Sequence, residues 1–428
     1  MMQDWFSEAT LGIFIHWGIY SAGDTSESWD FYNGNVSYEA YMAQNASFTA
    51  ERYDPEAWAR LFAESGAKYA VLTAKHHDGF ALWDTQENSW NCKESSPAGR
   101  DLIGPYCEAL RRHGLKVGIY YSHLDWSHPD YATILPKSPK PRHAAMQHNR
   151  FGYPQGPENP LAWERFLAFH RAQLKELCRR YQPDLLWFDG DWERDADQWR
   201  FKELREQLHE WAPGVILNSR MGSFGDYGSP EQAIPIARPS GPWEFCVTMN
   251  DSWGYRKQDR NYKTIPQCIR MLAECAGMGG NLLLDIGPKS DGVILPEQAE
   301  ILKGLGRWTH RNAEAFYGTV AGLPHGHFYG PSTLDLKTNV LYLITFDRPN
   351  QEVAVKGIRN KILKTSIVGG HEVQNRKLGG APWAGLPGVL WIKVPEMEID
   401  ADATVIKVEL EGPLDLYSGA GDNVTFNQ

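Results

Sequence analysis

The first three-quarters of the chain alternates short apolar runs with longer amphipathic stretches, and this repeat restricts the possible folds more than any other feature. The apolar runs lie at residues 12–17, 69–74, 117–121, 184–189, 215–218, 243–247 and 281–286. They are almost continuously hydrophobic, as parallel strands buried on both faces are. Helical patterns lie at residues 55–65, 102–113, 161–181, 198–211 and 265–276. Such alternation predicts either a (β/α) barrel or a doubly wound sheet.

Two observations favour the barrel. No Gly-x-Gly-x-x-Gly motif follows a strand, so the fingerprint of a dinucleotide-binding sheet is missing. Polar side chains instead follow several strands, among them His16, His76, Asp189 and Arg220, and a barrel carries its active site at the carboxyl ends of its strands. We therefore predict an irregular (β/α)8 barrel over residues 1–318. The irregularity is expected in residues 221–260, which lack a helical pattern, and the eighth strand is expected near residues 234–237.

The hydrophobic pattern of the sequence changes at about residue 318. Runs at residues 340–346, 352–355, 389–394 and 404–409 alternate apolar with polar side chains, and Gly, Pro and Asn separate them. Strict alternation is typical of strands that have one face in a core and one face in water. Residues 319–428 are therefore expected to form a C-terminal antiparallel β-sandwich.

Charge and hydropathy exclude several classes of partner. The chain has 43 Lys and Arg against 53 Asp and Glu, a net charge of −10, which argues against nucleic acid or an anionic membrane surface as the main partner. No apolar run approaches the roughly 18 residues of a membrane-spanning helix. The first residues show no pattern of a secretory signal, which suits a cytoplasmic protein or a periplasmic or secreted one whose signal has been removed. The sequence leaves the oligomeric state open.

The cysteines argue against a zinc or redox site, whereas the tryptophans leave a carbohydrate site open. The six cysteines form no Cys-x-x-Cys pair, so unpaired, buried thiols are expected rather than a zinc or redox site. Of the 17 tryptophans, 15 precede residue 320. Indole rings stack well on the apolar faces of sugars, but they are also large core residues. Tryptophan content alone therefore does not decide between a carbohydrate site and a large core.

Asp189 is the first candidate for chemistry. It closes the apolar run Leu-Leu-Trp-Phe-Asp and stands between Trp187 and Trp192. A carboxylate among aromatic rings at a strand end is either a catalytic group or a residue that caps the turn into the next loop. Its neighbour Asp191 is expected to support the loop.

A histidine pair is the second candidate. His76 and His77 lie in Ala-Lys-His-His-Asp-Gly-Phe, next to Asp78. Two imidazoles beside a carboxylate could bind a metal ion, but neighbouring residues at a strand end point in opposite directions and a third ligand is not apparent. We therefore expect no metal, and favour hydrogen bonds to substrate hydroxyls over a structural role. His16, at the end of the first strand, is interpreted in the same way.

Two glutamates compete for a second catalytic role. A glycosidase needs one ionised carboxyl group and one that stays protonated near neutral pH. Glu231 follows Gly, Ser and Pro on a loop, whereas Glu244 lies within an apolar strand beside Trp243. The residues alone do not separate the two. Further along, Asn281 and Asp285 in Asn-Leu-Leu-Leu-Asp-Ile are expected to satisfy backbone groups.

The motifs, taken in order, resemble a known family. The sequence contains FIHWG, AKHHDGF, YYS followed by DW, WFDGDW, NSR, PE, WE and NLLLDIGP in the first 318 residues. This series is similar to that of the α-L-fucosidases of glycoside hydrolase family 29. The resemblance implies an irregular (β/α)8 barrel followed by a β-sandwich, retaining chemistry on fucosylated oligosaccharides or polysaccharides, and no metal or organic cofactor.

The resemblance also implies roles for single residues. Asp189 takes the place of the nucleophile and Glu231 that of the acid/base, with Glu244 kept as the alternative. The places that bind the sugar fall on a larger set: His16, His76, His77, Tyr120, Trp187 and Arg220. Phe14 and Trp253 match the pocket for the methyl group of fucose. The family usually has Glu-Trp-Tyr after the first strand, and here Glu27 or Trp29 takes the place of that glutamate.

The sequence thus predicts a retaining exo-α-L-fucosidase. Within the same fold, an exo-glycosidase acting on L-galactosides is the nearest alternative. A carbohydrate-binding pseudoenzyme is a second, although the presence of both Asp189 and Glu231 counts against it. A metal-dependent hydrolase that uses His76 and His77 is a third. The sequence does not indicate which fucosyl linkage or leaving group is preferred, or whether sulfated substrates are accepted.

Overall fold

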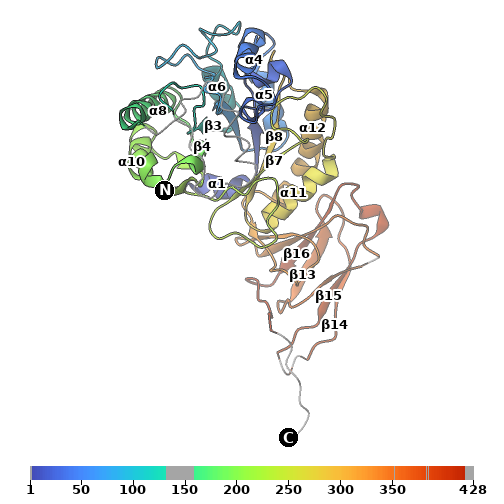
Figure 1. The fold of residues 1–428 in the computed structure, drawn as a ribbon. Coiled ribbons are helices and arrows are strands. Elements are labelled where there is room, and N and C mark those ends of the chain that lie inside the picture. Colours follow the sequence, from blue (N-terminus) through green and yellow to red (C-terminus); the bar gives the residue numbers. More distant parts are fainter. Residues whose placement is uncertain (1, 132–158, 351, 382, 384, 420–428) are drawn as a thin grey trace.

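The computed structural model describes residues 2–131, 159–350, 352–381, 383 and 385–419. A barrel-like domain with helices around a curled parallel sheet leads into a smaller region of antiparallel strands, which ends at the C-terminus (Figure 1). This is the fold class that the sequence predicts. All six cysteines are buried and free, as expected.

Seven parallel strands form the central sheet, and each coincides with one of the apolar runs. They are β1 (Leu11–Ile15), β2 (Tyr69–Lys75), β3 (Lys116–Ser122), β4 (Leu185–Asp189), β5 (Ile216–Leu217), β7 (Glu244–Thr248) and β8 (Asn281–Ile286). Their order in the sheet is β5-β4-β3-β2-β1-β8-β7. Nearly every residue in them is buried, which explains their continuous hydrophobicity.

Between β5 and β7 the chain forms the short strand β6 (Arg220–Ser223), which is not part of the seven-stranded sheet, and then a segment that closes the barrel through isolated bridges. Single parallel bridges join Asn218 to Tyr227, Gly228 to Trp243 and Glu231 to Cys246. Residues 227–231 thus occupy the place of the missing barrel strand. The expectation of a strand at residues 234–237 was wrong: this stretch is irregular and Ile236 is fully exposed. Glycine, proline and serine interrupt the segment that does close the barrel, so it carries no strand pattern.

Helices surround the sheet (Figure 1). The main ones are α5 (Pro55–Glu64), α6 (Ile103–Arg112), α8 (Pro160–Tyr181), α10 (Phe201–Trp211), α11 (Ile265–Gly277) and α12 (Pro296–Arg311). Local signals fix several starts: the Asp54 side chain accepts a hydrogen bond from the Ala57 N–H at α5, and Thr264 and Gln267 form a capping box at α11. The helix expected over 198–211 is divided, because Arg200 adopts a left-handed conformation between α9 (Ala196–Trp199) and α10.

The C-terminal region contains two antiparallel sheets. The first has the order β13-β16-β11-β10-β9, and the second β12-β15-β14. Their bounds are β9 (Val320–Ala321), β10 (Ser332–Asp335), β11 (Val340–Thr345), β12 (Glu352–Val355), β13 (Ile362–Ile367), β14 (Asn375–Leu378), β15 (Val389–Lys393) and β16 (Thr404–Leu410). Leu341, Leu343, Val353, Ile392 and Ile406 belong to the core between the sheets. This is the predicted sandwich.

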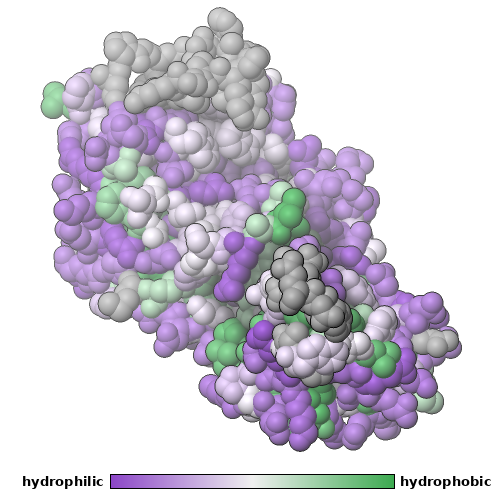
Figure 2. Space-filling view, turned by 90° about the horizontal axis from the view of Figure 1, so that it is seen from below, coloured by the Kyte–Doolittle hydropathy of each residue, from purple (hydrophilic) through white to green (hydrophobic). Residues whose placement is uncertain are grey.

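The central strand of the five-stranded sheet, β11, is buried on both faces. Val340, Tyr342 and Ile344 alternate with the inward residues of β11 and belong to the core of the barrel. The indole N–H of Trp308 on α12 donates to the carbonyl of Ala403 across this contact. The face seen in Figure 2 is mostly hydrophilic with scattered hydrophobic patches. Among the described residues, no helix combines the length and hydropathy needed to cross a bilayer.

Candidate active site

Asp189 lies where β4 ends, and its carboxylate is held from three directions. Tyr120 Oη donates to Oδ2 at 2.9 Å, while Arg220 Nη1 and the Gly190 N–H donate to Oδ1 at 3.0 and 3.1 Å. Gly190 has φ of 84°, and a Cβ there would lie 2.3 Å from Leu124 Cγ, so only glycine fits this turn. Burial raises the pKa of Asp189, while Arg220 and the hydrogen bonds oppose that rise.

Arg220 joins Asp189 to Glu231. Its guanidinium contacts Asp189 through Nη1 and Glu231 Oε2 through Nη2 at 2.5 Å. Burial disfavours its charge, but the two carboxylates outweigh burial and raise its pKa. Glu231 lies on the irregular closing segment and its side chain is 38% exposed. One partly buried carboxylate and one accessible carboxylate are therefore held by a single cation.

His77 faces Asp189 with an unsatisfied ring nitrogen. Its Nδ1 lies 2.6 Å from Ser122 Oγ, and that hydroxyl donates its only proton to the Leu124 carbonyl. Nδ1 must therefore carry the ring proton and donate, which leaves a lone pair on Nε2. This atom is buried without a hydrogen-bond partner, 3.6 Å from Asp189 Oδ2. Burial, then Lys75, Arg220 and His16 lower the pKa of His77, so the ring is neutral at neutral pH.

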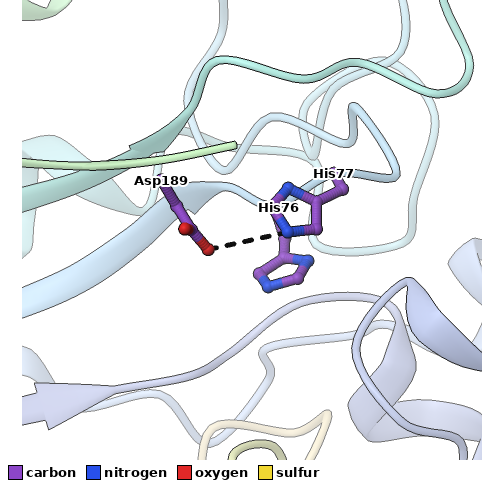
Figure 3. A group of neighbouring side chains, drawn as sticks. All are labelled: His76, His77 and Asp189. Atoms are coloured by element: carbon purple, nitrogen blue, oxygen red, sulfur yellow. Dashed lines mark ion pairs between the residues drawn. The ribbon is translucent and has the colours of Figure 1, made fainter. Parts of the chain in front are cut away.

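His76 and His77 both turn toward Asp189 (Figure 3). Their ring centroids are 4.2 Å apart, so the expectation that they point in opposite directions was wrong. The reason is that β2 ends at Lys75: both histidines lie in the turn that follows, where the alternation of a strand no longer applies. His76 Nδ1 lies 2.7 Å from Ser28 Oγ, and burial and His77 lower its pKa.

The same three residues have the spacing of a metal site. One ligand atom from each of His76, His77 and Asp189 lies within 4.8 Å of the other two. However, Arg220 already supplies a positive charge to this carboxylate, and Tyr120 donates to the oxygen that faces His77. A cation would have to compete with both. The metal-free site stays a prediction, with its test given below.

Asp285 orients His16. Its Nδ1 lies 2.6 Å from Asp285 Oδ1, and both side chains are buried. Asn281 satisfies backbone groups as expected, by accepting from the Thr10 N–H and donating to the Phe6 carbonyl. The carboxylate of Asp285 also contacts the imidazole of His16, which the sequence did not predict. Burial, then His76, lower the pKa of His16.

Aromatic rings pack below these polar groups. The ring centroid of Trp187 lies 4.9 Å from that of Phe14 and 5.6 Å from that of Tyr120. The rings of Trp187 and Tyr120 are stacked, with an angle of 15° between their planes. Trp253 contacts Phe14 at 6.0 Å and His16 at 4.9 Å. Phe14 and Trp187 are almost fully buried, while Trp253 is half-buried. The structure thus brings together the two residues expected around a methyl group.

Glu27 and Trp29 occupy different sides of this region. Glu27 is buried, its Oε2 accepts from the Gly254 N–H next to Trp253, and burial raises its pKa to about 7. Trp29 is half-buried, with its ring 5.6 Å from that of His77 and near-parallel to Trp192 at 6.1 Å. Either residue is therefore close to a candidate binding group, as the sequence left open.

Glu244 lies inside the barrel. Its side chain is fully buried, Oε1 accepts from Trp187 Nε1 at 2.9 Å, and Oε2 accepts from Tyr69 Oη. Burial raises its pKa to about 7, while the two hydrogen bonds oppose the rise. Because both oxygens are occupied and the group is inaccessible, the geometry favours Glu231 over Glu244 as a proton donor to a ligand.

Sequence reasoning missed the residues that orient the three histidines. These are Asp285 for His16, Ser28 for His76 and Ser122 for His77. Ser122 and Asp285 lie on β3 and β8, which are neighbours of histidine-bearing strands only in the folded sheet. Their strand-end positions were the available signal, but the pairing required knowledge of the strand order.

The curled sheet, with two carboxylates and neutral histidines at the carboxyl ends of its strands, defines the class of barrel-fold glycoside hydrolases. Comparison with known sequences identifies the family. The model of the α-L-fucosidase family matches residues 1–314. Rat tissue α-L-fucosidase is 34% identical over 345 residues, which cover 74% of this chain and 70% of the rat protein. The chain belongs to the α-L-fucosidase family.

Solved structures agree with this assignment. An α-L-fucosidase isoenzyme from Paenibacillus thiaminolyticus is 33% identical with a TM-score of 0.84, and the match covers 95% of this chain and 98% of that one. A family 29 α-L-fucosidase from Bacteroides thetaiotaomicron is 25% identical with a TM-score of 0.83, covering 96% and 97%. That structure is described as a trapped covalent intermediate formed with 2-fluoro-fucosyl fluoride in a Glu-to-Gln mutant.

Proposed function

We propose that this α-L-fucosidase is a retaining, exo-acting enzyme that removes terminal fucose from glycans by double displacement. The observation that carries the proposal is the guanidinium of Arg220, which contacts Asp189 and Glu231 together. Two carboxylates held by one cation lie close enough to act on the same glycosidic bond.

In the first step Asp189 attacks the anomeric carbon. The bond from this carbon to the leaving oxygen breaks as Glu231 gives that oxygen its proton, and a fucosyl ester of Asp189 forms. In the second step Glu231 takes a proton from water, whose oxygen displaces Asp189 and releases fucose. The covalent intermediate in the Bacteroides relative supports this route. Tyr120 and Arg220 orient Asp189 and keep it ionised through direct hydrogen bonds.

The histidines supply acceptors for sugar hydroxyls. The neutral ring of His77 has a buried lone pair at Nε2, and this atom needs a hydrogen-bond donor from a ligand. A hydroxyl is such a donor, whereas a carboxylate or carbonyl group is not. The orienting contacts of His16 and His76 also use Nδ1, so each leaves Nε2 for another partner.

The apolar floor supports exo action. Phe14 and Trp187 are buried beneath the polar groups, and Trp253 packs against the former. We infer that these rings close the site beneath the bound sugar, so that a glycan chain does not continue beyond it. The substrate is therefore a terminal fucosyl residue, and its methyl group is the part that suits an apolar floor.

Two alanine variants test the proposal together on an aryl α-L-fucoside. Asp189→Ala should lose nearly all turnover, and azide should restore it with formation of the inverted β-L-fucosyl azide. Glu231→Ala should retain activity on activated aryl fucosides but lose it on oligosaccharides, whose leaving groups need a proton. With azide it should give the retained α-L-fucosyl azide. If Asp189→Ala keeps more than a few per cent of the wild-type kcat, which corresponds to less than about 2 kcal/mol of barrier, the nucleophile lies elsewhere.

A further inference from the structure

Glu244 is a buried acid that the proposed mechanism does not use. It begins β7, and its carboxylate contacts side chains from two other strands of the barrel, β2 and β4. The indole N–H of Trp187 and the hydroxyl of Tyr69 each donate to a different oxygen. An indole N–H can only donate, so the orientation of Trp187 depends on an acceptor at this point.

Trp187 in turn contacts both side chains that bind Asp189. Its ring stacks on Tyr120, whose hydroxyl donates to Oδ2 of Asp189. The guanidinium of Arg220 lies over the indole, 5.3 Å from its centre, and donates to Oδ1. A rotation of the indole would therefore displace the two donors that orient the carboxylate. Displacement by about 1 Å can reduce a rate by about a hundredfold.

We propose that Glu244 is a positioning residue, which fixes Trp187 so that Tyr120 and Arg220 hold Asp189 in place for attack. This inference rests on the proposed function, because it assumes that Asp189 is the nucleophile. Glu244 acts from inside the barrel and touches neither substrate nor the reacting atoms. The apolar surroundings of Glu244 in the sequence, beside Trp243, made it a candidate acid/base. In this proposal they belong to a buried residue that supports Trp187.

A glutamine at this position separates positioning from proton transfer. Its carbonyl oxygen can still accept from Trp187, and its amide can donate to the Tyr69 hydroxyl, which accepts as well as donates. Glu244→Gln should therefore keep kcat on an oligosaccharide within about threefold of wild type. Glu244→Leu, which offers no acceptor, should lower kcat by about 30-fold or more with KM little changed.

The dependence on the leaving group gives the second readout. Loss of positioning slows attack by Asp189 on every substrate, so Glu244→Leu should be impaired equally on an activated aryl fucoside and on an oligosaccharide. Azide should not restore its turnover, because both Asp189 and Glu231 are still present. Tyr69→Phe is the matched control: it removes the other donor to Glu244 and leaves the contact with Trp187, so kcat should stay within about threefold.

Three outcomes overturn the inference. If Glu244→Gln loses oligosaccharide activity yet gives α-L-fucosyl azide, Glu244 is the acid/base. If a folded Glu244→Leu keeps the wild-type kcat, the contact has no catalytic consequence. If Glu244→Leu, Glu244→Gln and Tyr69→Phe all lose activity to the same extent, the network is only structural. Should Glu244→Leu fail to fold, Trp187→Phe removes the same N–H and must show the same uniform fall in kcat. The azide test on Asp189→Ala is independent, so its failure alone would refute the proposed function.

Discussion

Three acidic residues in and beneath the site differ in the contacts that their environments allow. Glu244 is enclosed and has both oxygens occupied, Asp189 is partly enclosed and held by Tyr120 and Arg220, and Glu231 is accessible. A nucleophile must be oriented and ionised, whereas an acid/base must exchange protons with a leaving group and with water. In the proposed mechanism the oriented carboxylate of Asp189 serves as the nucleophile, and the accessible carboxylate of Glu231 serves as the acid/base.

Sequence reasoning placed candidate site residues at strand ends, but the residues alone did not separate the two glutamates, and only the family resemblance favoured Glu231. Asp189 closes an apolar run, and such a position is visible in the sequence alone. Glu231 and Glu244 are separated by accessibility, which depends on how residues 227–231 close the barrel between β5 and β7. The closing segment has no regular pattern, so neither its path nor the exposure of Glu231 could be predicted.

The contact between Phe14 and Trp253 predicts a measurable substrate preference. An L-galactoside differs from a fucoside by one hydroxyl, which would lose water against Phe14 and Trp253 and gain no partner. Wild-type kcat/KM should therefore favour the fucoside by roughly 10- to 200-fold, the range expected for an apolar pocket that rejects a hydroxyl. Trp253→Ala should narrow this ratio, mainly by slowing the fucoside.

The control for this variant is Trp383→Ala, since Trp383 is 76% exposed on the C-terminal sandwich. Removing it should leave the ratio of the two kcat/KM values unchanged. An unchanged ratio in Trp253→Ala would place this ring outside the specificity pocket and leave it a packing residue.

At the scale of elements, the strands and helices of the barrel follow from hydrophobic patterning, whereas the geometry of the turns does not. The seven strands lie within a few residues of their predicted ranges because almost every residue in them is buried. The histidine pair lies one residue past the end of β2, where a turn brings both rings to the same side. Short β9 and the exposed β14 lacked a distinct pattern and were not anticipated.

The turn after β2 also carries the candidate metal ligands, so the metal-free prediction can be tested there. Because Arg220 and Tyr120 already bind the carboxylate of Asp189, activity should survive dialysis against EDTA. The measurement is kcat on an aryl fucoside before and after dialysis, with metal content determined on the same sample. Loss of activity with EDTA, followed by recovery with zinc, would instead make His76 and His77 metal ligands.

At the scale of the whole molecule, the sandwich stabilises the barrel by covering it. One face of its five-stranded sheet, including Val340 and Tyr342, packs into the barrel core, and Trp308 of α12 donates to Ala403. We propose that the two domains divide at residues 318 and 319. The sequence predicted a second domain but not its contact with the barrel. The hydrophobic pattern of β11 does not reveal what covers the outer face of the strand.

Truncation after Gly318 tests the role of this contact. The cut exposes apolar surface around α11 and α12, so the barrel alone should aggregate or unfold at a lower temperature. The soluble fraction should keep its preference among fucosyl oligosaccharides. Val405→Asp, which places a charge in the same contact, should lower Tm in the full-length protein without changing that preference. A stable, fully soluble barrel would show that the sandwich is only tethered.

The central claim is that Asp189 forms a covalent bond to fucose, and trapping the intermediate tests it most directly. The protein should be incubated with 2-fluoro-fucosyl fluoride, digested with protease and analysed by peptide mass spectrometry. The fluorine slows both steps, and a good leaving group keeps the first step faster than the second. The account predicts one fucosyl adduct, on the peptide that contains Asp189, and its absence from Asp189→Ala. An adduct on Glu231, Glu244 or any other residue would contradict it.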